Sequence, residues 1–145
     1  MKRDVYEGGI RAPLIARWPG TIRAGQFCDY PCAAWDLLPT AAEFAGVPPP
    51  PGIDGVSLVP SLGGRPQPQH APFYWEYGHV CDEFKQAVRD GVWKGVRVGA
   101  KKPVEVYNLA NDPAEANNAN GVYRKLVAIA QVTKWGFQRY RCTEN

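Results

Sequence analysis

A chain of 145 residues, 45% hydrophobic and 12% aromatic, is long enough to bury a core and too apolar to be disordered as a whole. No apolar run approaches the roughly 20 residues that a membrane-spanning helix needs, so a membrane span is not expected. The net charge of +3 comes without any run of five basic residues, so nucleic-acid binding is not expected either.

The beginning of the chain predicts a turn followed by one short strand. Paired glycines at positions 8 and 9 indicate the turn, because glycine accepts positive φ without a Cβ clash. Residues 13–18 form an apolar run that ends at the turn dipeptide Pro19-Gly20. We therefore expect a short buried strand at residues 13–18.

Residues 36–45 predict the first long helix. Asp36 is suited to the N-cap, and Gly46 is suited to the position just past the C-terminus. The residues expected on its apolar face recur at helical spacing: Leu37, Ala41, Phe44 and Ala45. Four consecutive prolines at positions 48–51 then predict a stiff, extended linker.

After the linker the hydrophobic pattern changes to a period of two. Strands are expected at residues 73–77, 87–89, 92–98 and 104–109, with short turns between them. Strands linked so closely must be antiparallel neighbours. Apolar residues return to helical spacing at residues 122–135, and such a helix most often covers one face of a sheet. The second half therefore predicts a four-stranded antiparallel meander and a C-terminal helix.

The residues do not assemble a complete active site from chemistry alone. His70 and His79 lie in loop contexts, and the sequence motifs of zinc proteases, lipases and phosphate-binding loops are missing. Cys28 and Cys32 have no second close pair of cysteines or histidines, so no metal site is predicted. Whether the four cysteines are free thiols or disulfide-bonded stays open.

Several short motifs nevertheless follow one another along residues 2–135. They read KRDVYEGGIRAP at 2–13, WPG at 18–20, DLLPT at 36–40, DGVSL at 54–58, YWE and AVRDGVWK at 74–76 and 87–94, and YNLANDPAE at 107–115. In this order they resemble the C-terminal part of the arylsulfatase-like sulfatase family, whose fold is similar to that of alkaline phosphatase.

The resemblance implies an α/β alkaline phosphatase-like fragment. Residues 1–52 would be the tail end of the large α/β domain, with one strand, one helix and the proline linker. Residues 53–145 would form a C-terminal α+β subdomain, in which a four-stranded antiparallel sheet packs on the C-terminal helix.

The resemblance also implies the activity of a sulfuric ester hydrolase, which cleaves sulfate esters through a formylglycine residue and calcium. The family makes formylglycine from Cys or Ser in the motif C/S-x-P-x-R, which this chain lacks, and the family's calcium ligands are missing as well. We therefore expect the chain alone to be inactive, with these groups and any signal peptide upstream of Met1. The compartment stays open, and the implied substrate is a small sulfate ester or a sulfated glycan.

Three residues are candidates for substrate contacts. Lys2 matches a lysine that stands four positions before the tyrosine in the family motif. In the family, this lysine contacts the sulfate of the substrate. An ammonium is a compact charge suited to neutralising sulfate oxygens, whereas in an isolated chain the alternative is a solvated terminal lysine. Glu76 and His79 would lie where the smaller domain borders the substrate cleft, since clefts often form between domains.

The second hypothesis is a non-catalytic binding module for a partner or a sulfated polysaccharide. The basic ends of the chain would supply its contacts, but the sequence has no dedicated basic cluster, so this hypothesis ranks second. In either case an unpaired apolar strand at residues 14–18 invites aggregation, so self-association of the isolated chain is expected.

Overall fold

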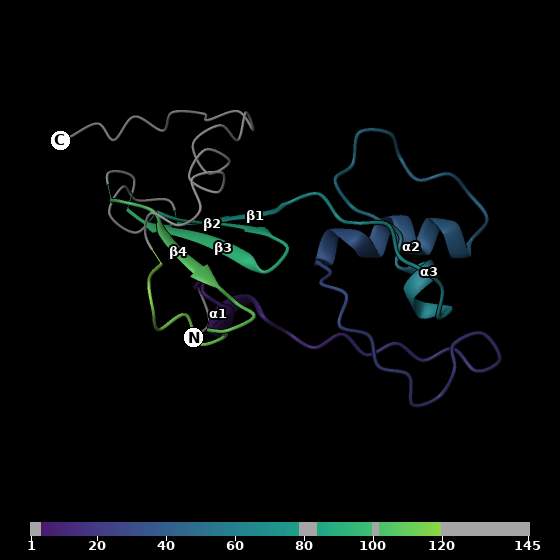
Figure 1. The fold of residues 1–145 in the computed structure, drawn as a ribbon. Helices are drawn as coiled ribbons and strands as arrows, with labels where there is room; N and C mark the ends of the chain where they lie inside the picture. Colours follow the sequence, from purple (N-terminus) through teal and green to yellow (C-terminus); the bar gives the residue numbers. More distant parts are fainter. Residues whose placement is uncertain (1–3, 79–83, 100–101, 120–145) are drawn as a thin grey trace. The chain divides into compact units, whose positions relative to one another are not determined.

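The computed structural model describes residues 4–78, 84–99 and 102–119 (Figure 1). Contacts divide the chain into two compact units. One is formed by Met1–Ala12 together with Pro72–Asn145, and the other by Pro13–Ala71. We call them the sheet unit and the helical unit and describe each by itself.

The sheet unit contains the predicted four-stranded antiparallel sheet. Its strands are β1 (Phe73–Tyr77), β2 (Lys85–Asp90), β3 (Trp93–Val98) and β4 (Glu105–Asn108), paired in the order β1-β2-β3-β4. The short connections allow only neighbouring antiparallel pairs, and Gly91 closes the β2–β3 turn with a φ of 62°. The four-stranded antiparallel meander of the predicted fold class is therefore confirmed.

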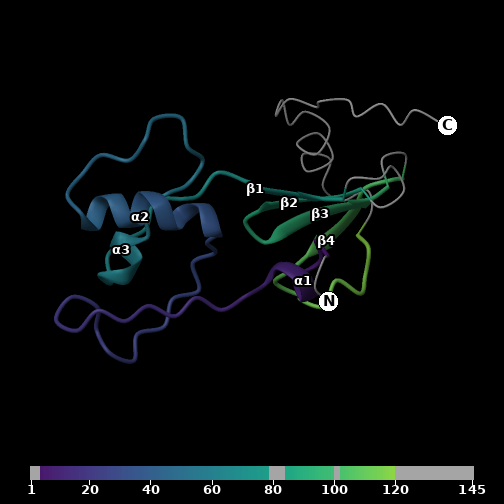
Figure 2. The same cartoon turned by 180° about the vertical axis from the view of Figure 1, so that it is seen from behind.

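Each face of the sheet carries a buried apolar cluster. On one face a buried cluster gathers residues from β2, β3 and β4 together with one residue of the N-terminal segment: Ala87, Val96, Tyr107 and Val5. Val88 and Val106 form a second buried cluster, packed against Tyr74, Trp93 and Val104. The short helix α1 (Glu7–Ile10) follows Val5 and lies alongside the sheet in both views (Figures 1 and 2). The N-terminal segment is thus part of the core of the sheet unit.

The helical unit contains η1 (Ala34–Asp36), α2 (Leu37–Phe44) and α3 (Val59–Leu62). The fully buried carboxylate of Asp36 joins its parts: it accepts the N–H of Ala33 at 2.7 Å and the N–H of Val56 at 2.8 Å. It also lies 3.0 Å from Nε2 of His70. Asp36 therefore links segments more than 30 residues apart instead of capping α2 with its side chain.

The predicted apolar face of α2 is wrong. The buried residues of the helix are Pro39, Thr40 and Ala42, whereas Leu37 is 52% exposed. The reason is that the hydroxyl of Thr40 donates to the carbonyl of Asp36 at 2.6 Å and accepts the N–H of Leu58 at 2.9 Å. The segment before α3 therefore covers the Thr40 side of α2. The end of α2 is as predicted, with Gly46 at a φ of 69°.

The predicted strand at residues 13–18 is also wrong, since these residues form no strand. Leu14 is 51% exposed and Ile15 is 89% exposed. Trp18, at the end of this run, packs against Phe44, with the two ring centroids 4.5 Å apart. A strand needs a partner backbone, and the helical unit contains no strand that could pair with this run.

Two expectations are not decided by the described residues. The helix expected at residues 122–135 lies outside them. The boundary between residues 52 and 53 concerns the domains of an intact enzyme and stays a prediction. Within residues 4–78, 84–99 and 102–119, no helix is long and apolar enough to cross a membrane.

Candidate functional site

Three motif segments meet at one buried group of charges in the sheet unit. The side chain of Lys94 on β3 is fully buried, and its Nζ lies 2.8 Å from Oε1 of Glu7 and 2.8 Å from Oε1 of Glu115. The two carboxylates are also almost fully buried, with side chains 9% and 3% exposed. We call these three residues the Lys94 cluster.

Each member of the Lys94 cluster comes from a different part of the chain. Glu7 begins α1, Lys94 stands opposite Tyr107 and Arg89 in the sheet, and Glu115 follows β4 by seven residues. In β3, Lys94 is two residues from Val96, so both side chains point to the face that carries Val5. The ammonium of Lys94 therefore lies on the side of β3 where the alternation of apolar and polar residues predicts an apolar side chain.

Glu115 contacts both other members of the cluster. Its Oε2 accepts the backbone N–H of Glu7 at 2.5 Å, and its Oε1 pairs with the ammonium of Lys94 as an ion pair without hydrogen-bond alignment. The backbone φ of Glu115 is 55°, a left-handed conformation that residues other than glycine rarely adopt. The carboxylate of Asp112 supports the turn around it by accepting the N–H groups of Ala116 and Asn117.

The charges in and around the cluster are balanced. A buried charge is costly unless it is paired, and here the two carboxylates face Lys94 and, at 3.9 Å from Oε2 of Glu7, Nη1 of Arg89. Arg89 is partly exposed, with a side chain 26% accessible, so its contribution is screened by solvent. Lys94 is therefore the main counter-ion of both carboxylates.

A second polar group, formed by Tyr6, Tyr107 and Glu105, holds Tyr6, the residue before Glu7. The hydroxyls of Tyr6 and Tyr107 both donate to Oε2 of Glu105, at 2.5 Å and 2.7 Å. Burial, followed by the hydrogen bond to Glu105, raises the pKa of both phenols well above the usual value for tyrosine. Both tyrosines therefore stay protonated donors, and they join the N-terminal segment to β4.

Two of the three residues predicted to contact substrate lie outside the described residues, namely Lys2 and His79. The third, Glu76, is an exposed residue of β1 that accepts the hydroxyl of Tyr74 at 2.9 Å. It does not belong to the Lys94 cluster. Cys28 and Cys32 are free, and burial raises the pKa of the Cys32 thiol.

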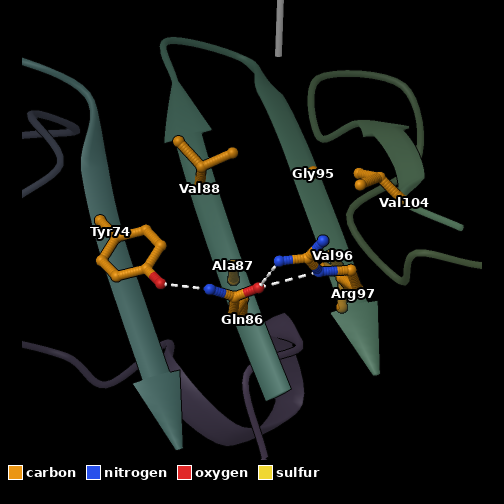
Figure 3. A pocket seen from close by; sticks show the side chains of 8 residues that line it. All are labelled: Tyr74, Gln86, Ala87, Val88, Gly95, Val96, Arg97 and Val104. Carbon is orange, nitrogen blue, oxygen red and sulfur yellow. Dashed lines mark hydrogen bonds between the residues drawn. The ribbon is translucent and has the colours of Figure 1, made fainter. Parts of the chain in front are cut away.

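Glu76 stands at one end of a polar row that crosses the sheet. Nε2 of Gln86 donates to the hydroxyl of Tyr74 at 2.6 Å, and Oε1 of Gln86 accepts Nε–H of Arg97 at 2.8 Å (Figure 3). Burial raises the pKa of Tyr74 to about 12. The row thus joins an acidic residue on β1 to a basic residue on β3.

The pocket beside this row is too small for a sugar. Its volume of about 10 Å³ is comparable to that occupied by one water molecule. The residues that line it are Tyr74, Gln86, Ala87, Val88, Gly95, Val96, Arg97 and Val104 (Figure 3). In the part of the chain that the structure describes, no three His, Cys, Asp or Glu side chains are grouped to hold a metal ion.

The sequence motifs indicated a family but not the role of the Lys94 cluster. Glu7, Lys94 and Glu115 each belong to a motif, but the motifs are up to 108 residues apart. One sequence signal existed: Lys94 shares its side of β3 with Val96 and Val98, and a charge in such a position calls for a buried partner.

Comparison with known proteins gives consistent matches along most of the chain. The family described as N-sulphoglucosamine sulphohydrolase, C-terminal, matches residues 1–135. Human steryl-sulfatase is 41% identical over 101 residues, which cover 64% of this chain and 17% of that protein. Dog N-acetylgalactosamine-6-sulfatase is 30% identical over 141 residues, which cover 79% of this chain and 27% of that protein.

A solved structure agrees with these matches. The protein Ps i-CgsB shares 26% sequence identity at a TM-score of 0.66, over 79% of this chain and 26% of that protein. The chain therefore spans less than a third of the length of each of these three proteins.

Proposed function

Since this chain belongs to the sulfatase family, we propose that it is the C-terminal portion of an enzyme that hydrolyses sulfate esters. The observation that carries the proposal is the family match over residues 1–135, which includes the segment of Lys2 and all four strands. Together with the missing nucleophile motif, this match supports different roles for this chain and for the rest of the enzyme. The chain contributes one substrate-binding segment and a supporting sheet, and the rest of the enzyme contributes the reactive groups.

The reactive groups belong to the part of the enzyme that precedes this chain. The described residues do not fit a calcium site, because they contain no suitable group of ligands. In the intact enzyme the formylglycine and calcium of the family would supply the nucleophile and polarise the sulfate. The chain alone is therefore expected to be inactive.

The proposed role of Lys2 is to bind the sulfate group. Its ammonium would neutralise the negative oxygens of the sulfate and the charge that develops on the leaving oxygen during cleavage. We assign Glu76 and His79 to the edge of the substrate cleft, as contacts to the alcohol part of the ester. The exposed position of Glu76 is compatible with that role.

The substrate class is a sulfate ester, either of a small molecule or of a glycan. The names of the two relatives include both kinds, a steryl-sulfatase and an N-acetylgalactosamine-6-sulfatase.

An assay with para-nitrophenyl sulfate tests the proposal. DNA upstream of the Met1 codon should extend the reading frame and encode C/S-x-P-x-R, and the extended protein should release para-nitrophenol. The chain of 145 residues should give no turnover above its own Lys2→Ala variant. Turnover by the short chain, or an extended protein without sulfatase activity, would show the proposal to be wrong.

The exposed apolar side chains of the helical unit support the prediction of self-association. Ile15 is 89% exposed and Phe27 is 97% exposed. Apolar surface of this kind favours association. Size-exclusion chromatography with light scattering should therefore show oligomers of the isolated chain, and the double variant Ile15→Lys, Phe27→Lys should shift the distribution toward monomer. The control Thr21→Lys, at an exposed polar position, should not. A monodisperse wild-type monomer would contradict the prediction.

A further inference from the structure

We propose that Asp36 and His70 form a proton-dependent latch, which holds the end of the helical unit against the residue that precedes α2. The two side chains are 0% and 5% exposed, and Nε2 of His70 lies 3.0 Å from Oδ1 of Asp36. The contact joins residues 34 positions apart within one unit. The latch is a pH-sensitive device of this unit, and it does not depend on the proposed function.

The contacts of the imidazole ring carry this proposal. Nδ1 of His70 lies 2.6 Å from the carbonyl oxygen of Ala71, whereas Nε2 faces the carboxylate of Asp36. Both oxygens are hydrogen-bond acceptors, but a neutral imidazole has only one N–H group. Either neutral tautomer would therefore place a nitrogen lone pair against an oxygen lone pair. The imidazolium has an N–H group on each nitrogen and satisfies both contacts.

The surroundings of Asp36 favour its ionised form. Its Oδ2 accepts the N–H of Ala33 at 2.7 Å, and its Oδ1, which faces His70, also accepts the N–H of Val56 at 2.8 Å. Such hydrogen bonds stabilise a carboxylate. A buried carboxylate is costly without a positive partner, and the imidazolium supplies that charge at hydrogen-bond distance. The closed latch is therefore a carboxylate paired with an imidazolium.

Two further titratable groups lie near Asp36, namely Tyr30 and Cys32. Burial is the main cause that raises the pKa of the Tyr30 phenol and of the Cys32 thiol, and the negative charge of Asp36 raises the pKa of both groups further. Both groups therefore stay predominantly neutral between pH 6 and pH 8. The hydroxyl of Tyr30 donates to the carbonyl of Pro68 at 3.0 Å, so it holds the same segment without a change of charge.

The latch should weaken as the pH rises. When it opens, His70 becomes a solvated imidazole, which loses its positive charge above about pH 6.5. Below this pH, closing the latch takes no proton from the solvent, so its stabilisation is complete. Above this pH, closing must take up one proton, so the equilibrium shifts toward the open form by up to about tenfold for each pH unit.

Hydrogen exchange of the 145-residue chain tests the latch. The N–H of Val56 donates to the same oxygen of Asp36 that faces His70, so its exchange reports the opening of this contact. After correction for the intrinsic pH dependence of exchange, the protection of the peptide that contains Val56 should fall by about tenfold from pH 6 to pH 8. A peptide from β3 is the reference and should change by less than about twofold.

Two variants complete the test. His70→Gln keeps an N–H donor but cannot titrate, so the change at Val56 should shrink to less than about twofold. His79→Gln, which replaces the other of the two histidines, should retain the full change. Equal pH dependence in the wild type and His70→Gln, its loss in His79→Gln, or its absence from the wild type would overturn the proposal.

A direct measurement of the ring protons covers the case in which His70→Gln fails to fold. The His79→Gln variant contains a single histidine, so its ring signals in a ¹⁵N spectrum belong to His70. At pH 7, chemical shifts of two protonated ring nitrogens would support the latch. One protonated and one unprotonated nitrogen would refute it.

Discussion

Replacing Lys2 with alanine is expected to lower kcat/KM of the intact sulfatase by about 100- to 1,000-fold, the range seen when one preorganised group that stabilises transition-state charge is removed. The reason is that cleavage transfers negative charge to the leaving oxygen, and an ammonium in contact with the sulfate stabilises that charge. Steady-state kinetics with an aryl sulfate measures the effect.

Two further variants sharpen this measurement. Arg3→Ala removes the neighbouring positive charge and should change kcat/KM by less than about threefold, because Lys2, and not Arg3, matches the sulfate-contacting lysine of the family. Lys2→Arg should recover only part of the activity, since a planar guanidinium is not interchangeable with a compact ammonium. A Lys2→Ala enzyme within threefold of the wild type would exclude a sulfate contact by this residue.

Replacing Lys94 with methionine should destabilise the sheet unit by about 3–5 kcal/mol, the usual cost of removing one partner from a buried ion group. Methionine fills a similar volume, but it leaves the buried carboxylates of Glu7 and Glu115 without their main counter-ion. Hydrogen exchange of peptides from β2 and β3 under native conditions measures this loss of stability. The exposed Lys102→Met should cost less than about 0.5 kcal/mol.

A combined variant tests whether charge or volume causes the loss. Glu7→Gln, Lys94→Met and Glu115→Gln together remove all three charges of the cluster and should cost less than Lys94→Met alone, because no buried charge is left unpaired. A combined variant less stable than the single one would show that packing, and not charge pairing, dominates at this position.

The strands could be predicted because their causes are local. Alternating apolar residues, short connections and turn glycines determine the meander, and β1 has the predicted bounds, Phe73–Tyr77. The strand expected at residues 13–18 depends on a partner backbone, which hydrophobicity alone cannot supply. The same holds for α2, whose buried side depends on where Leu58 meets Thr40.

In the candidate site, too, some features follow from neighbouring residues and others depend on tertiary contacts. The motif containing Lys2 is a run of neighbouring residues and can be recognised without a structure. The Lys94 cluster depends on tertiary contacts: Lys94 could be noted as a charge on an apolar side of a strand, but neither of its partners follows from spacing. The left-handed turn that places Glu115 is likewise not visible in the residues around Asp112 and Pro113.

Glu7 and Lys94 are 87 positions apart in the sequence, and this separation has a consequence for biosynthesis. Residues 4–7 leave the ribosome before their binding partners on the sheet have been translated, and Glu115 follows 108 residues after Glu7. At about 5–20 residues per second, residues 4–7 wait several seconds without the contacts that will bury them. Closing so long a loop also costs chain entropy, so the docking of this segment should be among the last steps of folding. The segment that would carry the substrate contact is thus synthesised well before the residues that hold it in place.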